Sequence, residues 1–219
     1  MIVLAIDTAG VDCSAALYDS ETGRMLAAVT DMIGKGHAER LMAVIDEVLA
    51  QAALELKDVD RIAVVIGPGS FTGIRVGVAA ARGLALALDI SSVGITTLET
   101  LAAMHLGEPS GRPLLVAMDA KRNELYVQTF AADGRHLSEP VAMSPEDTAS
   151  LASSLSADVA GSGRALVMGE ENAAVADRFD IATVARLGAL KTEEASRPKP
   201  LYLRGPDAKP QTGYALARS

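Results

Sequence analysis

One glycine-rich run of the sequence has residue types that suit the binding of a phosphate group. Residues 67–77 read Gly-Pro-Gly-Ser-Phe-Thr-Gly-Ile-Arg-Val-Gly, between an apolar run and an Ala/Gly-rich stretch. A glycine-rich turn that opens a helix presents free N–H groups and the positive end of the helix dipole. However, no Lys follows the last glycine and the spacing is not G-x-G-x-x-G, so the run meets neither phosphate-binding rule. The run therefore predicts a tight strand-to-helix turn more than a phosphate site.

The helix expected after this turn has a small residue at every fourth position. Positions 73, 77, 81 and 85 are glycine or alanine, which leaves one helix face nearly bare, so that another helix can come close. A second apolar stripe is expected on an earlier helix. Two such helices, with two from a related partner, would make a pseudo-twofold four-helix contact. The alternative is that the small residues seat the helix on its own sheet. The predicted interface residues are Leu41, Val44, Ile45, Val48, Gly73, Ile74, Arg75, Gly77, Val78, Ala81 and Arg82.

The composition limits the classes of protein to consider. The chain has 219 residues, 49% apolar and 22% charged, enough for one large or two small domains. Its net charge of −8 argues against unaided nucleic-acid binding, which depends on Lys and Arg. The single cysteine, Cys13, excludes an intrachain disulfide. No basic leader opens the chain, and the apolar tract Val76–Leu88 contains Arg82 and is too short for a bilayer. We expect a cytoplasmic protein without membrane contact.

The first third of the chain alternates strand and helix patterns. Short apolar runs separated by turn residues predict a three-stranded antiparallel meander, and amphipathic and continuous apolar runs follow. The order β-β-β-α-β-α implies a mixed sheet with packed helices, and hence an α/β fold. The predicted strands are 2–6, 13–18, 25–29 and 61–66, and the predicted helices are 37–54 and 71–88.

A cluster of helix breakers at 106–113 predicts a domain boundary. We expect an N-terminal subdomain of residues 1–106 and a smaller, less regular C-terminal subdomain of residues 107–219. Its end, 196–219, carries five basic residues against one acidic residue and several prolines, which favour an extended basic tail. That tail is expected either to touch RNA or an acidic partner or to close over its own acidic body. Strands over 114–118, 125–130 and 166–168 and helices over 145–155 and 182–195 are predicted in this half.

Four segments of the sequence together resemble the TsaB (YeaZ) family of bacterial proteins. They are Ile6-Asp7-Thr8, the glycine-rich run, Asp119–Tyr126 and Pro200–Arg204, in the order that the family has them. The resemblance covers nearly the whole chain, closely over residues 1–130 and loosely over 135–195. It implies an actin-like fold of the sugar-kinase and Hsp70 ATPase type, with two related subdomains that are each a mixed sheet with packed helices.

The resemblance also implies a function. The family acts in the threonylcarbamoyladenosine modification of tRNAs that decode ANN codons, as a non-catalytic partner of the related catalytic subunit TsaD, with the ATPase TsaE. It implies a homodimer when that partner is absent, tRNA contact only through the complex, and ATP-Mg only at a shared interface. On its own the chain is expected to have no catalytic residue and no cofactor. The alternatives are a small-molecule kinase of the same fold, a metallopeptidase-like enzyme, or a free-standing nucleotide-binding regulator.

The resemblance separates this chain from the catalytic subunit at one pair of positions. TsaD carries a His-x-x-x-His pair just after the shared region, and two histidines four apart can share a metal on one helix face. Thr97 and Leu101 stand at the matching positions here. Because a Leu side chain cannot ligate a metal, we predict no metal site.

Three further residues match the nucleotide site of actin-like ATPases. Asp7 and Thr8 end the first predicted strand, and Asp119 ends the first strand of the second half, where those ATPases bind phosphate and magnesium. The turn Asp-Thr-Ala-Gly is displaced from the usual Asp-x-Gly-Thr form. These residues predict a vestigial nucleotide site, and the alternative for Asp7 is a structural carboxylate that caps the turn.

Overall fold

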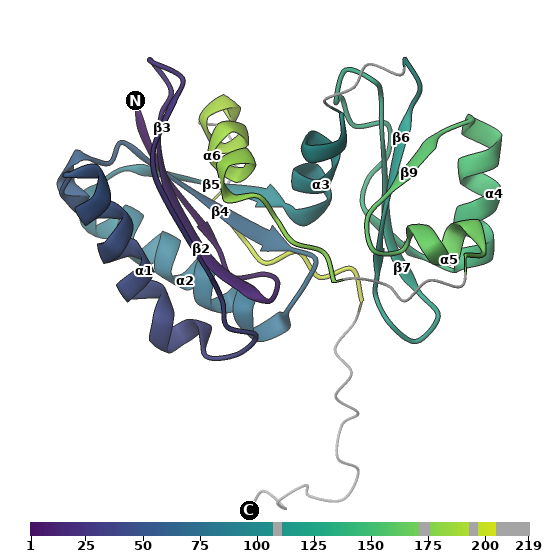
Figure 1. Ribbon diagram of the computed structural model, residues 1–219, viewed down its shortest axis with the longest axis horizontal. Helices are drawn as coiled ribbons and strands as arrows, with labels where there is room; N and C mark the ends of the chain where they lie inside the picture. The colour runs from purple at the N-terminus through teal and green to yellow at the C-terminus, as the bar shows by residue number, and fades with distance from the viewer. Residues whose placement is uncertain (107–110, 171–175, 193–196, 205–219) are drawn as a thin grey trace, which may run out of the picture.

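Two β-sheets with helices packed on their faces make up the part of the chain that the structure describes (Figure 1). The structure is a computed structural model, and it describes residues 1–106, 111–170, 176–192 and 197–204. The predicted α/β fold with a mixed sheet in each half is confirmed. The prediction of an extended basic tail falls mostly on residues 205–219, outside the described residues.

The first sheet has the strand order β3-β2-β1-β4-β5, with β1 in the middle. Its first three strands form the predicted antiparallel meander, and β4 and β5 continue it in parallel. β1 reads as a continuous apolar run because helices cover both faces of the sheet. The strands are β1 (Ile2–Asp7), β2 (Asp12–Asp19), β3 (Arg24–Met32), β4 (Arg61–Gly67) and β5 (Ser91–Thr96).

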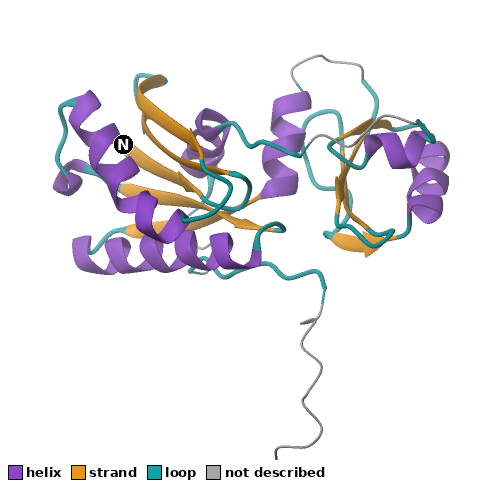
Figure 2. Ribbon diagram, turned by 60° about the horizontal axis from the view of Figure 1, so that its bottom comes forward, coloured by secondary structure: helices purple, strands orange, loops and turns teal. Residues whose placement is uncertain are grey.

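Three helices cover the first sheet. α1 (His37–Ala52) and α2 (Phe71–Leu88) lie on one face, and α6 (Ile181–Leu190) lies on the other (Figures 1 and 2). A short 3₁₀ turn, Leu56–Asp58, follows α1. Asp180 caps the start of α6, and its carboxylate accepts hydrogen bonds from the Ala182 and Thr183 N–H groups.

The second sheet has the order β8-β7-β6-β9. α4 and α5 pack against it on the outside, and α3 lies between the two sheets, in contact with strands of both and with α6 (Figure 1). The strands are β6 (Leu114–Asp119), β7 (Leu125–Phe130), β8 (Val141–Met143) and β9 (Asp158–Ala160). The helices are α3 (Thr97–His105), α4 (Pro145–Leu155) and α5 (Arg164–Met168).

The last described part of the chain returns to the first sheet. α6 packs on β1, β2 and β4, and the Leu201 N–H donates to the Ile66 carbonyl at 2.8 Å. Residues 197–204, here called the strap, then reach the second sheet, where Arg204 pairs with Glu124. Assigning everything after residue 107 to a C-terminal subdomain is therefore wrong for α6 and for the strap.

Some predicted elements differ from the structure. The run 166–168 is part of helix α5, not a strand, because three apolar residues fit a short buried helix as well as a strand. The elements predicted from the sequence do not include β5, α3, β8 or β9. α3 did carry a signal, because Thr96 and Glu99 form a capping box in which each side chain accepts from the other residue's N–H.

α2 lies so close to its own sheet that its glycines leave no room for side chains. A Cβ atom on Gly73 would lie 1.9 Å from the Thr8 carbonyl oxygen, and one on Gly77 would lie 2.5 Å from Thr8 Oγ1. Gly83, on the exposed side of the same helix, has no atom within 4 Å of that position. The small-residue face therefore seats the helix on its own sheet, which is the alternative that the sequence left open.

α2 extends beyond the apolar tract Val76–Leu88, which by itself is too short to span a bilayer. By length and composition it is the one helix among the described residues that would be able to cross a membrane. Its inner face packs against β1 and β4, and core helices of α/β folds have the same apolar composition.

The seating of α2 predicts opposite effects of one substitution at two glycines. Gly73→Ala should destabilise the fold by about 1–3 kcal/mol, because its methyl group meets backbone that cannot move aside. Gly83→Ala, the matched control, should stabilise it by about 0.5–1 kcal/mol, because alanine favours an exposed helix position. Urea unfolding measures both free energies, and equal effects would contradict the close seating.

Candidate functional site

Asp7 ends β1 with its side chain fully buried. The Ala9 N–H donates to Oδ1 at 2.8 Å, and Oδ2 has no hydrogen-bond partner among the described residues. Burial raises the pKa of Asp7 from 3.8 to about 7, against a smaller lowering by the Ala9 N–H. The geometry is that of a carboxyl group that caps its own turn, as in the structural alternative.

The Thr8 side chain is buried beside Asp7, where the end of β1 meets α2. Its Oγ1 donates to the Gly73 carbonyl at 2.7 Å, which ties the end of β1 to the first turn of α2. The Ser70 N–H donates to the Ala9 carbonyl at 2.7 Å. The polar groups of this turn therefore hold the glycine-rich run in place.

Asp119 lies apart from Asp7, in a cleft between the two sheets. The cleft has a volume of about 360 Å³, and Ala9 and Gly10 line it together with Asp119. Burial alone would raise the pKa of Asp119, but hydrogen bonds from the Lys121 side chain and N–H lower it overall. The structure thus brings Asp119 to the turn that follows Asp7, but not to the Asp7 carboxyl group.

Two residues that line the cleft, Asp177 and Phe179, and the adjacent Arg178 gave no signal in the sequence. Asp177 accepts hydrogen bonds from the N–H and Oγ of Ser162, and burial raises its pKa. Arg178 makes two hydrogen bonds to the buried Asp12 carboxylate, at 2.8 and 3.0 Å. The ring of Phe179 would lie 3.2 Å from a Cβ on Gly10. Residues 177–179 therefore close the cleft over the turn after β1.

This arrangement does not fit a magnesium nucleotide. Mg²⁺ prefers free carboxylate oxygens beside the phosphates. In the described cleft Lys121 engages Asp119 and Ser162 engages Asp177, while Asp7 is sealed in the core. The two carboxyl groups also outnumber the single ammonium group, which disfavours a bare phosphate. The vestigial nucleotide site stays a prediction.

Nine of the eleven predicted interface residues are buried inside this chain. Because they pack against the chain's own sheet, they cannot form a partner surface without unfolding, and this part of the interface prediction is wrong. They are Leu41, Val44, Ile45, Val48, Gly73, Ile74, Gly77, Val78 and Ala81. Arg75 and Arg82 are exposed, as a surface role requires.

The opposite sides of α1 and α2 form a surface that we call the outer helix face. Its exposed residues are Met42, Ala43, Asp46, Thr72, Arg75, Ala79, Arg82 and Leu86. At one end Arg75 lies 3.6 Å above the Phe71 ring and donates from Nε to the Tyr202 hydroxyl at 2.8 Å. Phe71 and Tyr202 are 51% and 44% exposed, with ring centroids 5.2 Å apart. Three large side chains are thus held in a fixed arrangement at the surface.

Thr97 and Leu101 lie one turn apart near the start of α3 and are both buried. Thr97 Oγ1 donates to the Pro68 carbonyl at 2.7 Å, and Leu101 packs in the core. Both side chains therefore support the fold around the glycine-rich turn. No group of three or more His, Cys, Asp or Glu residues that would hold a metal is found among the described residues.

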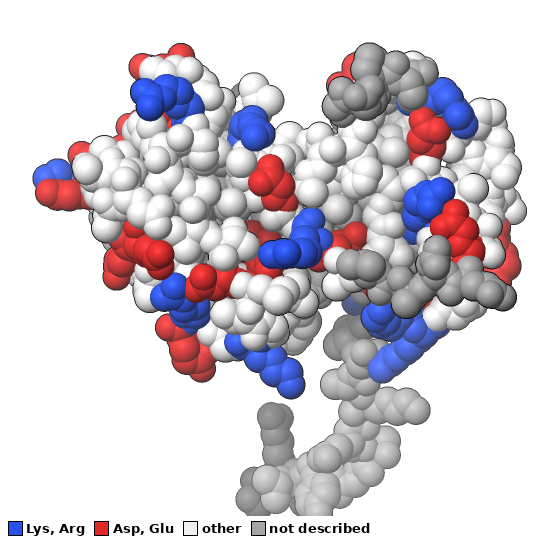
Figure 3. Space-filling view, in the orientation of Figure 1, with Lys and Arg blue, Asp and Glu red and all other residues white. Residues whose placement is uncertain are grey.

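Charged side chains of both signs are interspersed over the face of the molecule seen in Figure 3. Among the described residues on that face, no continuous basic surface is visible. This distribution agrees with the acidic net charge of −8.

The chain is similar to proteins of one tRNA-modification pathway. A family model described as "TsaD: tRNA N6-adenosine threonylcarbamoyltransferase" matches residues 29–196. The tRNA threonylcarbamoyladenosine biosynthesis protein TsaB of Escherichia coli (strain K12) is 34% identical over 133 residues, 61% of this chain and 56% of that protein. TsaB of Bacillus subtilis (strain 168) is 34% identical over 130 residues, 59% of this chain and 55% of that protein. The chain thus spans just over half the length of these curated relatives.

Other relatives match over more than nine tenths of both chains. An uncharacterized protein of Mycobacterium tuberculosis is 33% identical over 227 aligned positions, 95% of this chain and 94% of that protein. The crystal structure of YeaZ from Pseudomonas aeruginosa has a TM-score of 0.73 at 28% identity, covering 92% of this chain and 99% of that one. A second structure, of an uncharacterized protein with similarity to peptidase YeaZ from Pseudomonas aeruginosa, has a TM-score of 0.77 at 28% identity, with 93% and 99% covered. The chain thus shares its fold with these two structures, and the predicted α/β class is confirmed.

The buried Asp7 predicts a pH dependence of stability. Its pKa is raised from 3.8 to about 7 in the folded chain, so between these values the native state holds a proton that the unfolded chain has released. The contribution of Asp7 to stability therefore falls as pH rises from about 4 to about 7 and is then level.

Asp7→Asn removes this titration and keeps the acceptor for the Ala9 N–H. We expect the stability of the variant relative to wild type to increase across that window, as measured by urea unfolding at pH 4, 5.5, 7 and 8. A difference that stays constant with pH would contradict the raised pKa.

Proposed function

The chain belongs to the TsaB (YeaZ) family, and on this premise we propose that it is a non-catalytic subunit in the threonylcarbamoyladenosine modification of tRNA. The relatives named TsaB are biosynthesis proteins of that modification. The proposed partner is a TsaD-type catalytic subunit, and its role is to hold that subunit in a competent shape.

One observation carries the non-catalytic part of the proposal. Thr97 and Leu101 occupy the positions of the expected metal-binding histidine pair. Their side chains bind the Pro68 carbonyl and fill the core, so they take a structural role where the catalytic relative would hold its metal. A Leu side chain has no atom that can ligate a metal, and this position cannot take up the metal-dependent transfer chemistry.

The outer helix face is the proposed partner surface. Aromatic and arginine side chains are the residue types that contribute most to binding energy at protein interfaces. Phe71, Arg75 and Tyr202 are held together at the surface by a cation–π contact and a hydrogen bond, so little side-chain freedom is lost when a partner covers them. Ala79, on the same side of α2, leaves room for a partner helix to come close. A second copy of the chain is the proposed occupant when the TsaD-type partner is absent.

The remaining parts of the complex are proposed from the family. A TsaE-type ATPase joins the pair, and ATP-Mg binds at an interface shared between subunits, because the cleft of this chain alone does not fit it. tRNA is held through the assembled complex, in keeping with the acidic charge of this chain. The complex is proposed to act in the cytoplasm.

The partner surface predicts where a substitution abolishes binding without unfolding the chain. Ala79→Arg places a long charged side chain at an exposed position of the outer helix face. We expect it to weaken binding of the TsaD-type subunit by about 100-fold or more, because the charge must be desolvated at a close helix contact. Surface plasmon resonance with the partner from the same organism measures the affinity.

Ser153→Arg on α4 is the matched control, since it adds the same side chain at an exposed position away from the outer helix face. Both variants should melt within a few degrees of wild type. If Ala79→Arg binds the partner as tightly as Ser153→Arg does, the outer helix face is not the partner surface.

A further inference from the structure

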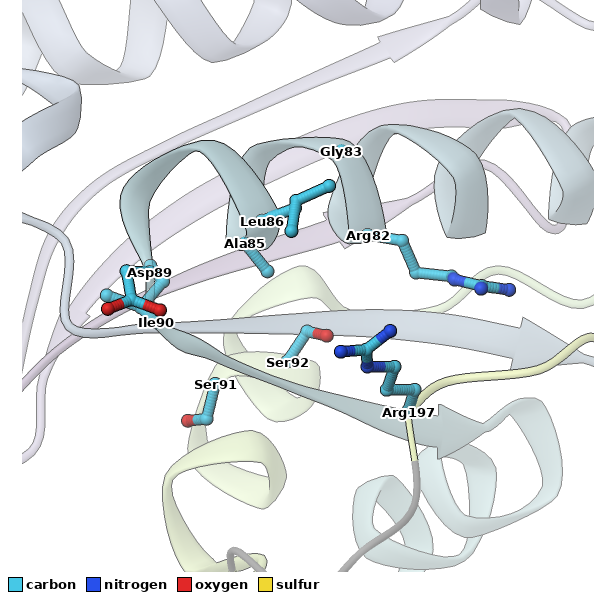
Figure 4. Close-up of a pocket in the computed structure, with 9 residues that line it drawn as sticks. All are labelled: Arg82, Gly83, Ala85, Leu86, Asp89, Ile90, Ser91, Ser92 and Arg197. Carbon is cyan, nitrogen blue, oxygen red and sulfur yellow. The ribbon is translucent and has the colours of Figure 1, made fainter.

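A second pocket lies between the C-terminal half of α2 and strand β5, away from the cleft between the sheets. It has a volume of about 420 Å³, within the range of small-molecule sites. Arg82 reaches it from α2, and Arg197 reaches it from the strap, 115 positions later in the chain. Figure 4 shows both arginines toward one end of the pocket and Asp89 at the other, with Ala85 and Leu86 on the helix between them.

The polar groups at the arginine end have no use inside the described chain. Neither Arg82 nor Arg197 makes a hydrogen bond or ion pair with a described residue, whereas Arg40, Arg112 and Arg178 are all paired. The Ser92 hydroxyl, next to Ser91 on the pocket wall, likewise has no partner among the described residues. The Ser91 hydroxyl, by contrast, accepts from Arg61 Nε inside the chain and points away from the two arginines. Two guanidinium groups and the Ser92 hydroxyl therefore lie toward one end of the pocket.

We infer that this pocket binds a phosphate group carried by a small molecule of nucleotide size. Two guanidinium groups match a phosphate monoester, which carries nearly two negative charges and three acceptor oxygens. A carboxylate has only two oxygens, and a single arginine fork satisfies both. Leu86 and Ala85 form the apolar middle of the pocket, and the Asp89 carboxylate at the far end accepts hydrogen bonds from hydroxyl or amino groups. The two arginines at one end, the apolar wall in the middle and the Asp89 acceptor at the far end fit a ligand in which a phosphate is joined to a sugar and a ring.

Arg82 and Leu86 belong both to this pocket and to the outer helix face, but the two proposals are tested by different measurements. The pocket belongs to this chain alone, and binding there is measured without any other subunit. A failure of the pocket therefore leaves the scaffold proposal untouched, and the reverse also holds.

AMP is the probe for this pocket, titrated into the full chain by calorimetry at low salt. We expect saturable binding with one site, at least tenfold tighter than inorganic phosphate or adenosine alone, because each of them fills only part of the pocket. Arg82→Ala and Arg197→Ala should each weaken AMP binding by about tenfold or more, since each removes charge-assisted hydrogen bonds to the phosphate. Arg24→Ala is the control and should leave the affinity unchanged, because Arg24 is exposed, lies outside the pocket and pairs with no described residue.

Thermal melting shows whether each variant is folded, and all three substitutions are at exposed positions. A 12-nucleotide RNA with a 5′-hydroxyl end separates the two sources of phosphate. Binding of this RNA without any binding of AMP would overturn the nucleotide assignment. No AMP binding at millimolar concentration, or equal AMP binding by wild type and by the variant lacking both pocket arginines, would overturn the site itself.

Discussion

The contact between the turn after β1 and the first turn of α2 is the constraint on which the rest of this structure depends. Thr8 Oγ1 donates to the Gly73 carbonyl and the Ser70 N–H donates to the Ala9 carbonyl, both at 2.7 Å. The two backbones come so close that Gly73 has no room for a Cβ atom. This contact fixes where α2 begins and which side of it faces the sheet.

That orientation decides which surface is left for function. With the glycines turned inward, the polar groups of the glycine-rich run are used within the chain, and Asp7 is sealed beneath the same turn. The outer side of α2, with Arg75 held against Phe71 and hydrogen-bonded to Tyr202, faces away from the core. The glycine-rich run therefore has a structural role, because it fixes the position of α2. The candidate partner surface is the side of α2 that faces away from the sheet.

Much of the first sheet could be predicted because its signals are local. Alternating and continuous apolar runs gave β1 to β4, and helical periodicity gave α1 and α2. The role of the small-residue face could not be predicted in the same way. A glycine or alanine at every fourth position permits close approach equally to a sheet of the same chain or to a partner helix, and only the tertiary contact to Thr8 distinguishes them.

The residues of the candidate sites likewise could be predicted only where a local sequence pattern marks them. Asp119 was found from its place at a strand end, but Asp177 and Phe179 reach the cleft from a segment without a motif. Arg82 was singled out for its helix position, whereas Arg197 joins it only because the strap returns to the first sheet. Residues far apart in the sequence carry no local signal that they meet in the fold. A short apolar run such as 166–168 is compatible with either a helix or a strand.

We propose that this chain is required for the tRNA modification without performing its chemistry. The most direct measurement is threonylcarbamoyladenosine formation on tRNA, reconstituted from the TsaD-type and TsaE-type subunits of the same organism with the activated substrate and ATP-Mg. The account predicts little product from those subunits without this chain, restoration when it is added, and no product from this chain alone. Full activity in its absence, or turnover by the isolated chain, would contradict the account.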